Sequence, residues 1–216
     1  MRIILLRHGE TDWNQERRLQ GRQDIKLNEK GLSQAKVVGG YLAETYGSRI
    51  SSIITSPLNR AVTTAGIVAD ALSFPKEQIV IEPLFVERDF GSAEGMSYEQ
   101  TSINFKSGRY PGMENLEELC LRARKAVAKY TEDPFAEQTI LVVAHGAIIK
   151  GVLTQASGGT VHYHDSDIWI ENGSFCMLSG PKEAARKDSN LPYDIGHWHI
   201  SLHNASVGFV GRQLGK

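Results

Sequence analysis

The sequence predicts an α/β fold built around a largely parallel β-sheet. Short apolar runs of strand length alternate with longer amphipathic stretches of helical period, which is the pattern of repeated β-α units. The chain has 216 residues, enough for one sizeable core, so we expect a single domain spanning residues 1–216. Its hydrophobic fraction of 41% and charged fraction of 23% are ordinary for a soluble globular protein.

Six apolar runs are predicted to form the strands. The first contains the continuous sequence Ile3-Ile4-Leu5-Leu6, which is typical of a strand buried on both faces of a parallel sheet. The six predicted strands are residues 2–7, 52–55, 79–81, 139–144, 174–178 and 197–202.

Four amphipathic stretches are predicted to form helices. Beyond the turn at Gly31, apolar side chains recur on one helical face at Leu32, Ala35, Val38 and Leu42. The next helix is expected over residues 60–72, just after Pro57, because proline suits the start of a helix. The remaining helices are predicted over residues 116–130 and residues 148–153.

Two polar stretches have no regular period. Residues 90–112 contain scattered Gly, Ser, Tyr and Pro, and residues 180–193 form a second polar excursion. Long irregular segments in compact domains are often lids or binding loops. We therefore expect a mobile loop that covers a site around residues 90–113.

The charge and cysteine content exclude several classes of partner. The formal net charge is −1, so we expect no general affinity for nucleic acid or for a membrane surface. Cys120 and Cys176 lack the spaced partners of a disulfide framework, as is usual in reduced intracellular proteins. The apolar run near the N-terminus is too short for a signal peptide, and no run approaches a membrane span. We expect a cytoplasmic protein, and the sequence predicts no particular oligomeric state.

The first predicted strand ends in Arg7-His8-Gly9. The carboxyl ends of strands in an open α/β sheet form the ligand crevice, so this cation and this imidazole are expected to face a site. Gly9 allows a sharp turn, and its carbonyl can fix one nitrogen of the imidazole. His8 would then direct its other nitrogen outward beside an arginine, as a nucleophile aimed at a phosphate requires.

Two further strand ends contribute similar groups. The run 139–144 continues into His145-Gly146, so two imidazoles are expected to face each other across adjacent strand ends. Arg60 follows the run 52–55 near the start of a helix, where a guanidinium can bind two phosphate oxygens at once. With Arg7 these groups predict a cationic site for one phosphoryl group, and such a site needs no metal or other cofactor.

A proton donor is also needed, because a phosphoryl group moves to a histidine only if the leaving alkoxide is protonated. Glu87, Asp89 and Glu94 lie within one short segment and are all candidates. Composition and spacing do not choose between them.

Together these segments resemble the histidine phosphatase superfamily, also called the phosphoglycerate mutase-like family. The matching segments are residues 7–14 (RHGETDWN), 56–61 (SPLNRA), 87–95 (ERDFGSAEG) and 144–146 (AHG). The resemblance implies a three-layer α/β/α sandwich around a mostly parallel sheet.

The resemblance also implies roles for individual residues. His8 resembles the phosphorylated nucleophile, His145 the second histidine that stabilises the transferring group, and Glu87 the proton donor. Arg7 and Arg60 resemble the phosphate clamp. Further phosphate and substrate contacts are implied for Asn14, Gln20, Gly21 and Gly146.

The resemblance covers both phosphatases and mutases, and the sequence favours a phosphatase. The mutases carry a long basic insertion after the Glu-Gly pair, whereas residues 96–113 contain only Lys106 and Arg109 as basic side chains. A shorter cover admits water, which competes with any other acceptor for the phosphohistidine. We expect a phosphomonoester hydrolase acting on a small phosphorylated metabolite. The alternatives are a cofactor-dependent phosphoglycerate mutase and a non-catalytic phospho-ligand-binding module, although the presence of both His8 and Glu87 argues against the module.

Other chemistries have weaker support in the sequence. Cys120 lacks the arginine six residues later that a cysteine-based phosphate loop requires, because Ala126 stands there. The pairs His162/His164 and His197/His199 have a spacing that can bind zinc, but neither has an obvious third ligand. No metal site is therefore predicted.

Overall fold

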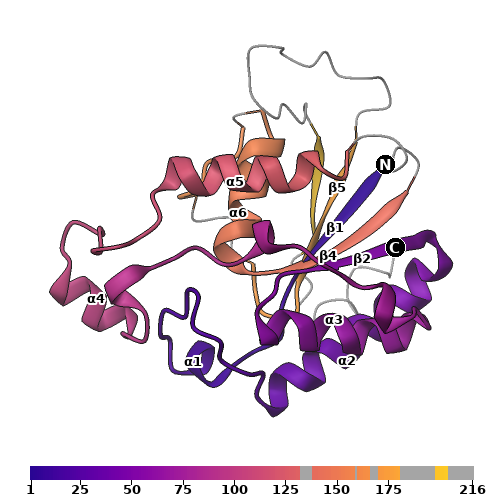
Figure 1. Ribbon diagram of the computed structural model, residues 1–216, viewed down its shortest axis with the longest axis horizontal. Helices are drawn as coiled ribbons and strands as arrows, with labels where there is room; N and C mark the ends of the chain where they lie inside the picture. Colours follow the sequence, from indigo (N-terminus) through magenta and orange to yellow (C-terminus); the bar gives the residue numbers. More distant parts are fainter. Residues whose placement is uncertain (132–137, 159, 166–169, 181–197, 204–216) are drawn as a thin grey trace, which may run out of the picture.

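The computed structural model describes residues 1–131, 138–158, 160–165, 170–180 and 198–203. These residues contain a six-stranded sheet with the strand order β3-β2-β4-β1-β5-β6 (Figure 1). The strands are β1 (Arg2–Arg7), β2 (Ile50–Thr55), β3 (Val80–Ile81), β4 (Thr139–Ala144), β5 (Phe175–Ser179) and β6 (His199–His203). β1, β2, β3 and β4 pair in parallel, whereas β5 runs antiparallel to both β1 and β6.

Two pairs of helices cover the two faces of the sheet (Figure 1). α2 (Glu29–Thr45) and α3 (Asn59–Leu72) pack together on one face, and α5 (Leu116–Ala128) and α6 (Gly146–Ala156) pack together on the other. The short helices are α1 (Asp12–Gln15), α4 (Tyr98–Asn104), η1 (Gly47–Arg49), η2 (Lys76–Gln78), η3 (Pro83–Phe85) and η4 (Gly91–Ala93). The predicted α/β/α sandwich with a mostly parallel sheet is confirmed.

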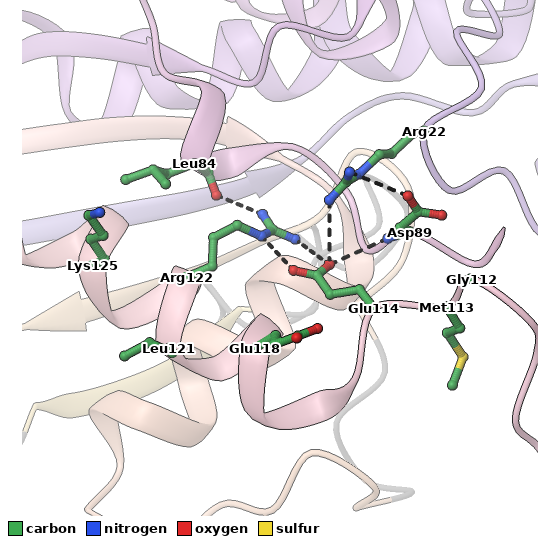
Figure 2. A pocket seen from close by; sticks show the side chains of 10 residues that line it. All are labelled: Arg22, Leu84, Asp89, Gly112, Met113, Glu114, Glu118, Leu121, Arg122 and Lys125. Atoms are coloured by element: carbon green, nitrogen blue, oxygen red, sulfur yellow. Dashed lines mark hydrogen bonds and ion pairs between the residues drawn. The ribbon is translucent and has the colours of Figure 1, made fainter.

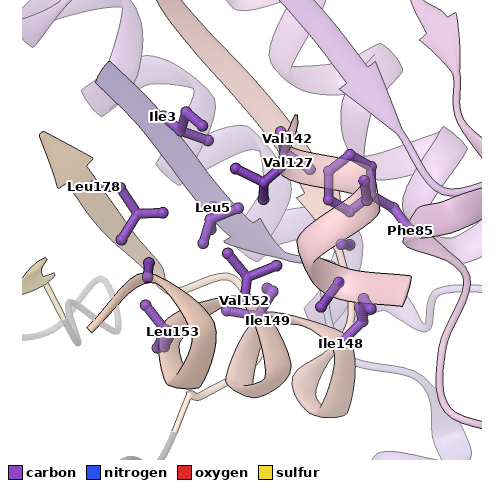
Figure 3. Packing of buried hydrophobic residues seen from close by; sticks show 14 of the residues in the cluster. Ile3, Leu5, Phe85, Val127, Val142, Ile148, Ile149, Val152, Leu153 and Leu178 are labelled. Carbon is purple, nitrogen blue, oxygen red and sulfur yellow. The ribbon is translucent and has the colours of Figure 1, made fainter. Parts of the chain in front are cut away.

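The apolar run of β1 joins the two halves of the core. Successive side chains of a strand point to opposite faces, so alternate residues enter different clusters. Ile3 and Leu5 pack with the helices α5 and α6, as Figure 3 shows, and Ile4 and Leu6 pack with α2 and α3. Burying one such side chain contributes about 1.5–3 kcal/mol. The strand that leads into His8 is therefore held firmly from both sides.

The predicted strands and long helices are all present, with shifts of a few residues at their ends. The expected irregular segment is wrong in part, because residues 98–104 form the helix α4. Ser97 accepts a hydrogen bond from the backbone N–H of Gln100, and the Gln100 side chain accepts one from the backbone N–H of Ser97. This local capping box starts a helix that has no clear apolar period. Residues 181–193 of the second polar excursion lie outside the described residues.

Two further predictions concern the cysteines and membrane-spanning helices. Both cysteines, Cys120 and Cys176, are free thiols. In the described parts of the chain, every helix is too short or too polar to cross a membrane.

Candidate active site

The carboxyl end of β1 brings His8 to the edge of the sheet. The backbone N–H of His8 still donates to the Ala144 carbonyl of β4 at 3.0 Å, and the chain then turns away at Gly9. Only glycine fits there, because a Cβ atom on Gly9 would lie 2.3 Å from the Gly31 carbonyl oxygen. His8 Nδ1 lies 2.6 Å from the Gly9 carbonyl oxygen. Because a carbonyl only accepts, Nδ1 carries the proton and Nε2 keeps its lone pair.

His145 reaches the same place from β4. The strands β1 and β4 are parallel neighbours, and the two imidazole rings lie 5.0 Å apart at an angle of 61°. The predicted meeting of the two imidazoles is therefore confirmed. His145 Nε2 lies 2.7 Å from Ser56 Oγ at the end of β2. Ser56 was not predicted as a site residue, although it stands in the matched segment 56–61.

Arg60 connects the two imidazoles. Its Nε–H is shared between His8 Nε2 and His145 Nδ1, each at 3.2 Å. Its Nη1 and Nη2 donate to the carbonyls of Gln23 and Gly21 at 2.6 and 2.8 Å. The guanidinium is buried, and burial lowers the pKa of Arg60 to about 10, so it stays charged at neutral pH. The shared Nε–H is long to both rings, so an entering anion can draw it away with little loss.

Both histidines are neutral in this environment. Burial is the main cause that lowers the pKa of His8 well below its usual value, and the charges of Arg60 and Arg7 act in the same direction. Burial and the Arg60 charge likewise lower the pKa of His145 well below its usual value. A neutral His8 whose unprotonated Nε2 is held only by the shared Nε–H of Arg60 has the form that nucleophilic attack requires once that donor moves to a phosphate oxygen.

Arg7 lies beside His8 and faces the start of α6. Its Nη1 donates to the Ile170 carbonyl at 2.7 Å, while its buried Nε has no hydrogen-bond partner among the described residues. A Cβ atom on Gly146 would lie 3.7 Å from the Arg7 guanidinium carbon, so glycine leaves the guanidinium uncovered. Burial lowers the pKa of Arg7 from its usual value. A buried donor without a partner is costly, and a phosphate oxygen would satisfy it.

Glu87 is the one of the three candidate acids that lies in this site. Its carboxylate accepts hydrogen bonds from the backbone N–H groups of Arg88, Ala147 and Ile148 at 2.9, 3.2 and 3.1 Å. Two of these donors belong to the first turn of α6, whose N-terminus favours a carboxylate.

Asp89 points in another direction. It pairs with Arg22 at 3.3 Å and lines a separate hollow of about 700 Å³, next to the Glu114–Arg122 ion pair (Figure 2). Asp89 therefore has its carboxylate outside the histidine site.

Glu94 supports the site without facing it. Its Oε1 accepts the backbone N–H of Arg22 at 2.9 Å, and its Oε2 accepts the Gln23 amide at 3.1 Å. Gly21 has a φ of +54°, and a Cβ atom there would lie 1.9 Å from Glu94 Oε1. Glu94 thus holds the turn of residues 20–23, whose carbonyls receive the Arg60 guanidinium.

These groups surround a cavity of about 510 Å³. Every predicted site residue except His145 lines it, and His145 accepts a hydrogen bond from Arg60, which does line it. The predicted residues in its wall are Arg7, His8, Asn14, Gln20, Gly21, Arg60, Glu87 and Gly146. Gln20 Oε1 is buried without a partner among the described residues, so it is available to a substrate.

Several residues of the cavity were not predicted. Asn172 donates to the His8 carbonyl and to Asn14 Oδ1, each at 3.1 Å. It reaches the site because the antiparallel β5 begins at the edge where β1 ends. The wall also contains Tyr98, Lys150 and Tyr163, which no motif marked.

The histidine pairs His162/His164 and His197/His199 have a spacing that can bind zinc. His164 lines the cavity, whereas His197 lies outside the described residues. In the described part of the chain, no cluster of three or more His, Cys, Asp or Glu side chains could hold a metal ion.

The comparisons with known proteins agree with this arrangement. Residues 3–188 match the family described as the histidine phosphatase superfamily, branch 1. The Bacillus subtilis protein named "Uncharacterized phosphatase PhoE" is 43% identical over 157 residues, which cover 73% of this chain and 78% of that protein. The Enterobacter protein named "Probable phosphoglycerate mutase GpmB" is 35% identical over 189 residues, which cover 82% of this chain and 84% of that protein.

A solved structure shares the fold. Bacillus stearothermophilus YhfR superimposes with a TM-score of 0.75 at 26% identity, covering 94% of this chain and 96% of that one. The chain therefore belongs to the histidine phosphatase superfamily and has the phosphoglycerate mutase-like fold. The relatives support a phosphatase or a mutase.

Proposed function

We propose that the protein is a phosphomonoester hydrolase that works through a phosphohistidine on His8 and needs no metal. The observation that carries the proposal is the hydrogen bond from His8 Nδ1 to the Gly9 carbonyl, which leaves the Nε2 lone pair for attack. In the first step, Nε2 bonds to the phosphorus of the substrate while the ester oxygen leaves as an alcohol. In the second step, water attacks the phosphohistidine and releases inorganic phosphate.

The charge of the transferring group would be stabilised by Arg7, Arg60 and His145. The unpartnered Arg7 Nε and the shared Arg60 Nε–H are donors that a phosphate oxygen can take. Fixed donors of this kind lower the barrier because they need no reorganisation during the reaction. Glu87 would give a proton to the leaving oxygen and then accept one from the attacking water.

Hydrolysis is favoured over mutase activity by the cover segment. Lys106 and Arg109 are exposed, and neither belongs to the wall of the cavity. Residues 96–113 therefore add no cation to the cavity wall that would help to retain a small acid for a second phosphorylation. The relative at 43% identity is also named as a phosphatase.

The test is a rapid quench with labelled substrate. We expect base-stable, acid-labile phosphate on the peptide that contains His8, and hydrolysis that persists in the presence of a chelator. The same reaction with 3-phosphoglycerate and a bisphosphoglycerate primer should release more phosphate than isomerised product. Loss of activity with chelator would refute the metal-free mechanism, and isomerisation a hundredfold faster than hydrolysis would assign the protein to the mutases.

A further inference from the structure

The cavity extends beyond the groups that would surround a phosphate, and a lysine lines the additional wall. The volume of about 510 Å³ is in the range of sites that enclose a whole small molecule. Lys150 of α6 lines this cavity together with Gly146 and Ala147. Residues three or four apart on a helix are neighbours on one face, so Lys150 lies one turn beyond the start of α6.

The cations of the cavity differ in how their donors are used. Arg60 has donors directed to two histidines and two backbone carbonyls, and Arg18 pairs with Glu16 at 2.5 Å. Arg7 keeps its Nε without a partner, which a phosphate would supply. For Lys150, no hydrogen bond or ion pair is found within the described ranges. One phosphate bound at Arg7 therefore leaves the Lys150 ammonium without a hydrogen-bonded anion among the described residues.

The acidic groups of the cavity are directed elsewhere. The Glu87 carboxylate accepts three backbone N–H groups, and Asp165 Oδ2 accepts the His162 backbone N–H at 2.7 Å. Burial lowers the pKa of Lys150, the Arg7 charge lowers it further, and Asp165 opposes them. A half-buried ammonium beside an arginine is poorly solvated, so a bound anion would stabilise it.

The position of Lys150 on α6 would bring its ammonium close to the alcohol part of the substrate. Glu87, the proposed proton donor to the leaving oxygen, is held by the backbone of Ala147 and Ile148. The leaving oxygen would therefore lie near the first turn of α6. One helical turn rises about 5.4 Å, a distance that a group two or three carbons from the ester oxygen can span with the help of a lysine side chain.

We propose that Lys150 is a specificity-determining residue that binds a carboxylate on the alcohol part of the phosphomonoester. The substrate class is then the phosphate esters of small hydroxy acids, and this inference rests on the proposed function. The single negative charge of a carboxylate balances the single positive charge of the Lys150 ammonium. A second phosphate carries close to two negative charges, more than the single positive charge of Lys150 balances.

The test compares two esters that differ in one group. 3-Phosphoglycerate carries a carboxylate where glycerol 3-phosphate carries a hydroxymethyl group. We expect wild-type kcat/KM to be about 10- to 100-fold higher for the acid, because hydrogen bonds to charged groups contribute that much. Lys150→Met should remove this preference with little effect on glycerol 3-phosphate, and Lys150→Arg should retain most of it. Lys36→Met, which removes an exposed charge on α2, is the matched control and should leave the preference intact.

Binding separates this inference from the proposed function. Calorimetry with the His8→Ala protein should show tighter binding of the acid, and His8→Ala/Lys150→Met should lose the difference. If the wild type hydrolyses neither ester, the proposed function fails, and this binding difference still tests Lys150. Equal affinity for both esters, or an equal loss for both in Lys150→Met, would overturn the inference. Melting temperatures of the variants show whether they fold, and Lys150→Gln serves if Lys150→Met does not.

Discussion

The ends of β1 and β4 have the same local sequence, but their two histidines have different hydrogen-bond partners. Each strand is followed by His-Gly, each imidazole is buried, and each accepts the Nε–H of Arg60 at 3.2 Å. At β1 the chain turns away, and the Gly9 carbonyl accepts a proton from Nδ1 of His8. At β4 the chain runs directly into α6 with His145 as the N-cap residue, and Nε2 meets the hydroxyl of Ser56.

The difference lies in the partner of the nitrogen that faces away from the cavity. A carbonyl can only accept, so it fixes one tautomer of His8. A hydroxyl can accept or donate, so His145 can change which nitrogen carries its proton. The fixed ring suits a nucleophile, and the adaptable ring suits a group that must donate to a phosphate oxygen once substrate arrives. Identical dipeptides thus differ in the hydrogen bond that one ring nitrogen makes, and this difference supports the separate roles proposed for them.

The largest effect should separate the two histidines directly. His8→Ala should lower kcat by about 10⁴-fold or more and abolish labelling, because it removes the proposed nucleophile. His145→Ala should cost about 10²- to 10³-fold, the usual loss of a stabilising donor, and should still form labelled protein. Rapid-quench labelling and steady-state kinetics measure both. If His8→Ala retained a tenth of the wild-type rate, His8 would not be the nucleophile.

The next effect concerns the acid held by the β4 end. Glu87→Gln should slow alkyl phosphates by about 10²- to 10⁴-fold and slow activated aryl phosphates much less, because good leaving groups need little protonation. Asp89→Asn is the matched control, since its carboxylate pairs with Arg22 in the separate hollow. Rates across a series of leaving groups decide the matter. If Asp89→Asn showed this leaving-group dependence and Glu87→Gln did not, Asp89 would be the proton donor.

A smaller effect should come from the turn that orients the shared arginine. Glu94→Ala removes the acceptor for the Arg22 N–H and the Gln23 amide, and we expect kcat/KM to fall about tenfold. Glu94→Gln keeps an acceptor oxygen and should recover most of the activity. In an Arg60→Ala background, Glu94→Ala should add little further loss, because residues that act through one another are not additive. Additive losses would mean that Glu94 acts on general stability.

The smallest effect concerns only which ring nitrogen of His8 and of His145 carries the proton. Nitrogen-15 NMR of the histidine rings at pH 6 should show His8 protonated on Nδ1 and His145 on Nε2, both neutral, because burial and Arg60 lower the pKa of each ring well below its usual value. Because the pKa of each ring is lowered, both rings stay neutral as the pH falls below the usual histidine range, and they become charged only on further acidification. Inorganic vanadate should move the proton of His145 and leave that of His8. Ser56→Ala should block this move, and an unchanged spectrum with vanadate would show that the two rings behave alike.

The sequence by itself determined the strands, the long helices and the residues at the strand ends. Continuous apolar runs at residues 3–6 and 140–144 specify buried strands, because burial on both faces leaves no polar alternation. Since parallel strands end at the same edge, the pairing of His8 with His145 followed from the pattern. The positions of Arg7 and Arg60 at strand ends also predicted a phosphate site, whereas the choice of Glu87 among three acids depended on the family resemblance; the roles of all three stay predictions.

Only the tertiary structure decided which groups complete the cavity. Asn172 arrives because β5 is antiparallel, which its short apolar run does not indicate. Glu87 is distinguished from Asp89 by the backbone donors of α6, and Lys150 is identified by the face of that helix that borders the cavity. Local sequence fixes periodicity and caps, whereas these contacts join residues far apart in the chain, and their geometry depends on how strands and helices pack.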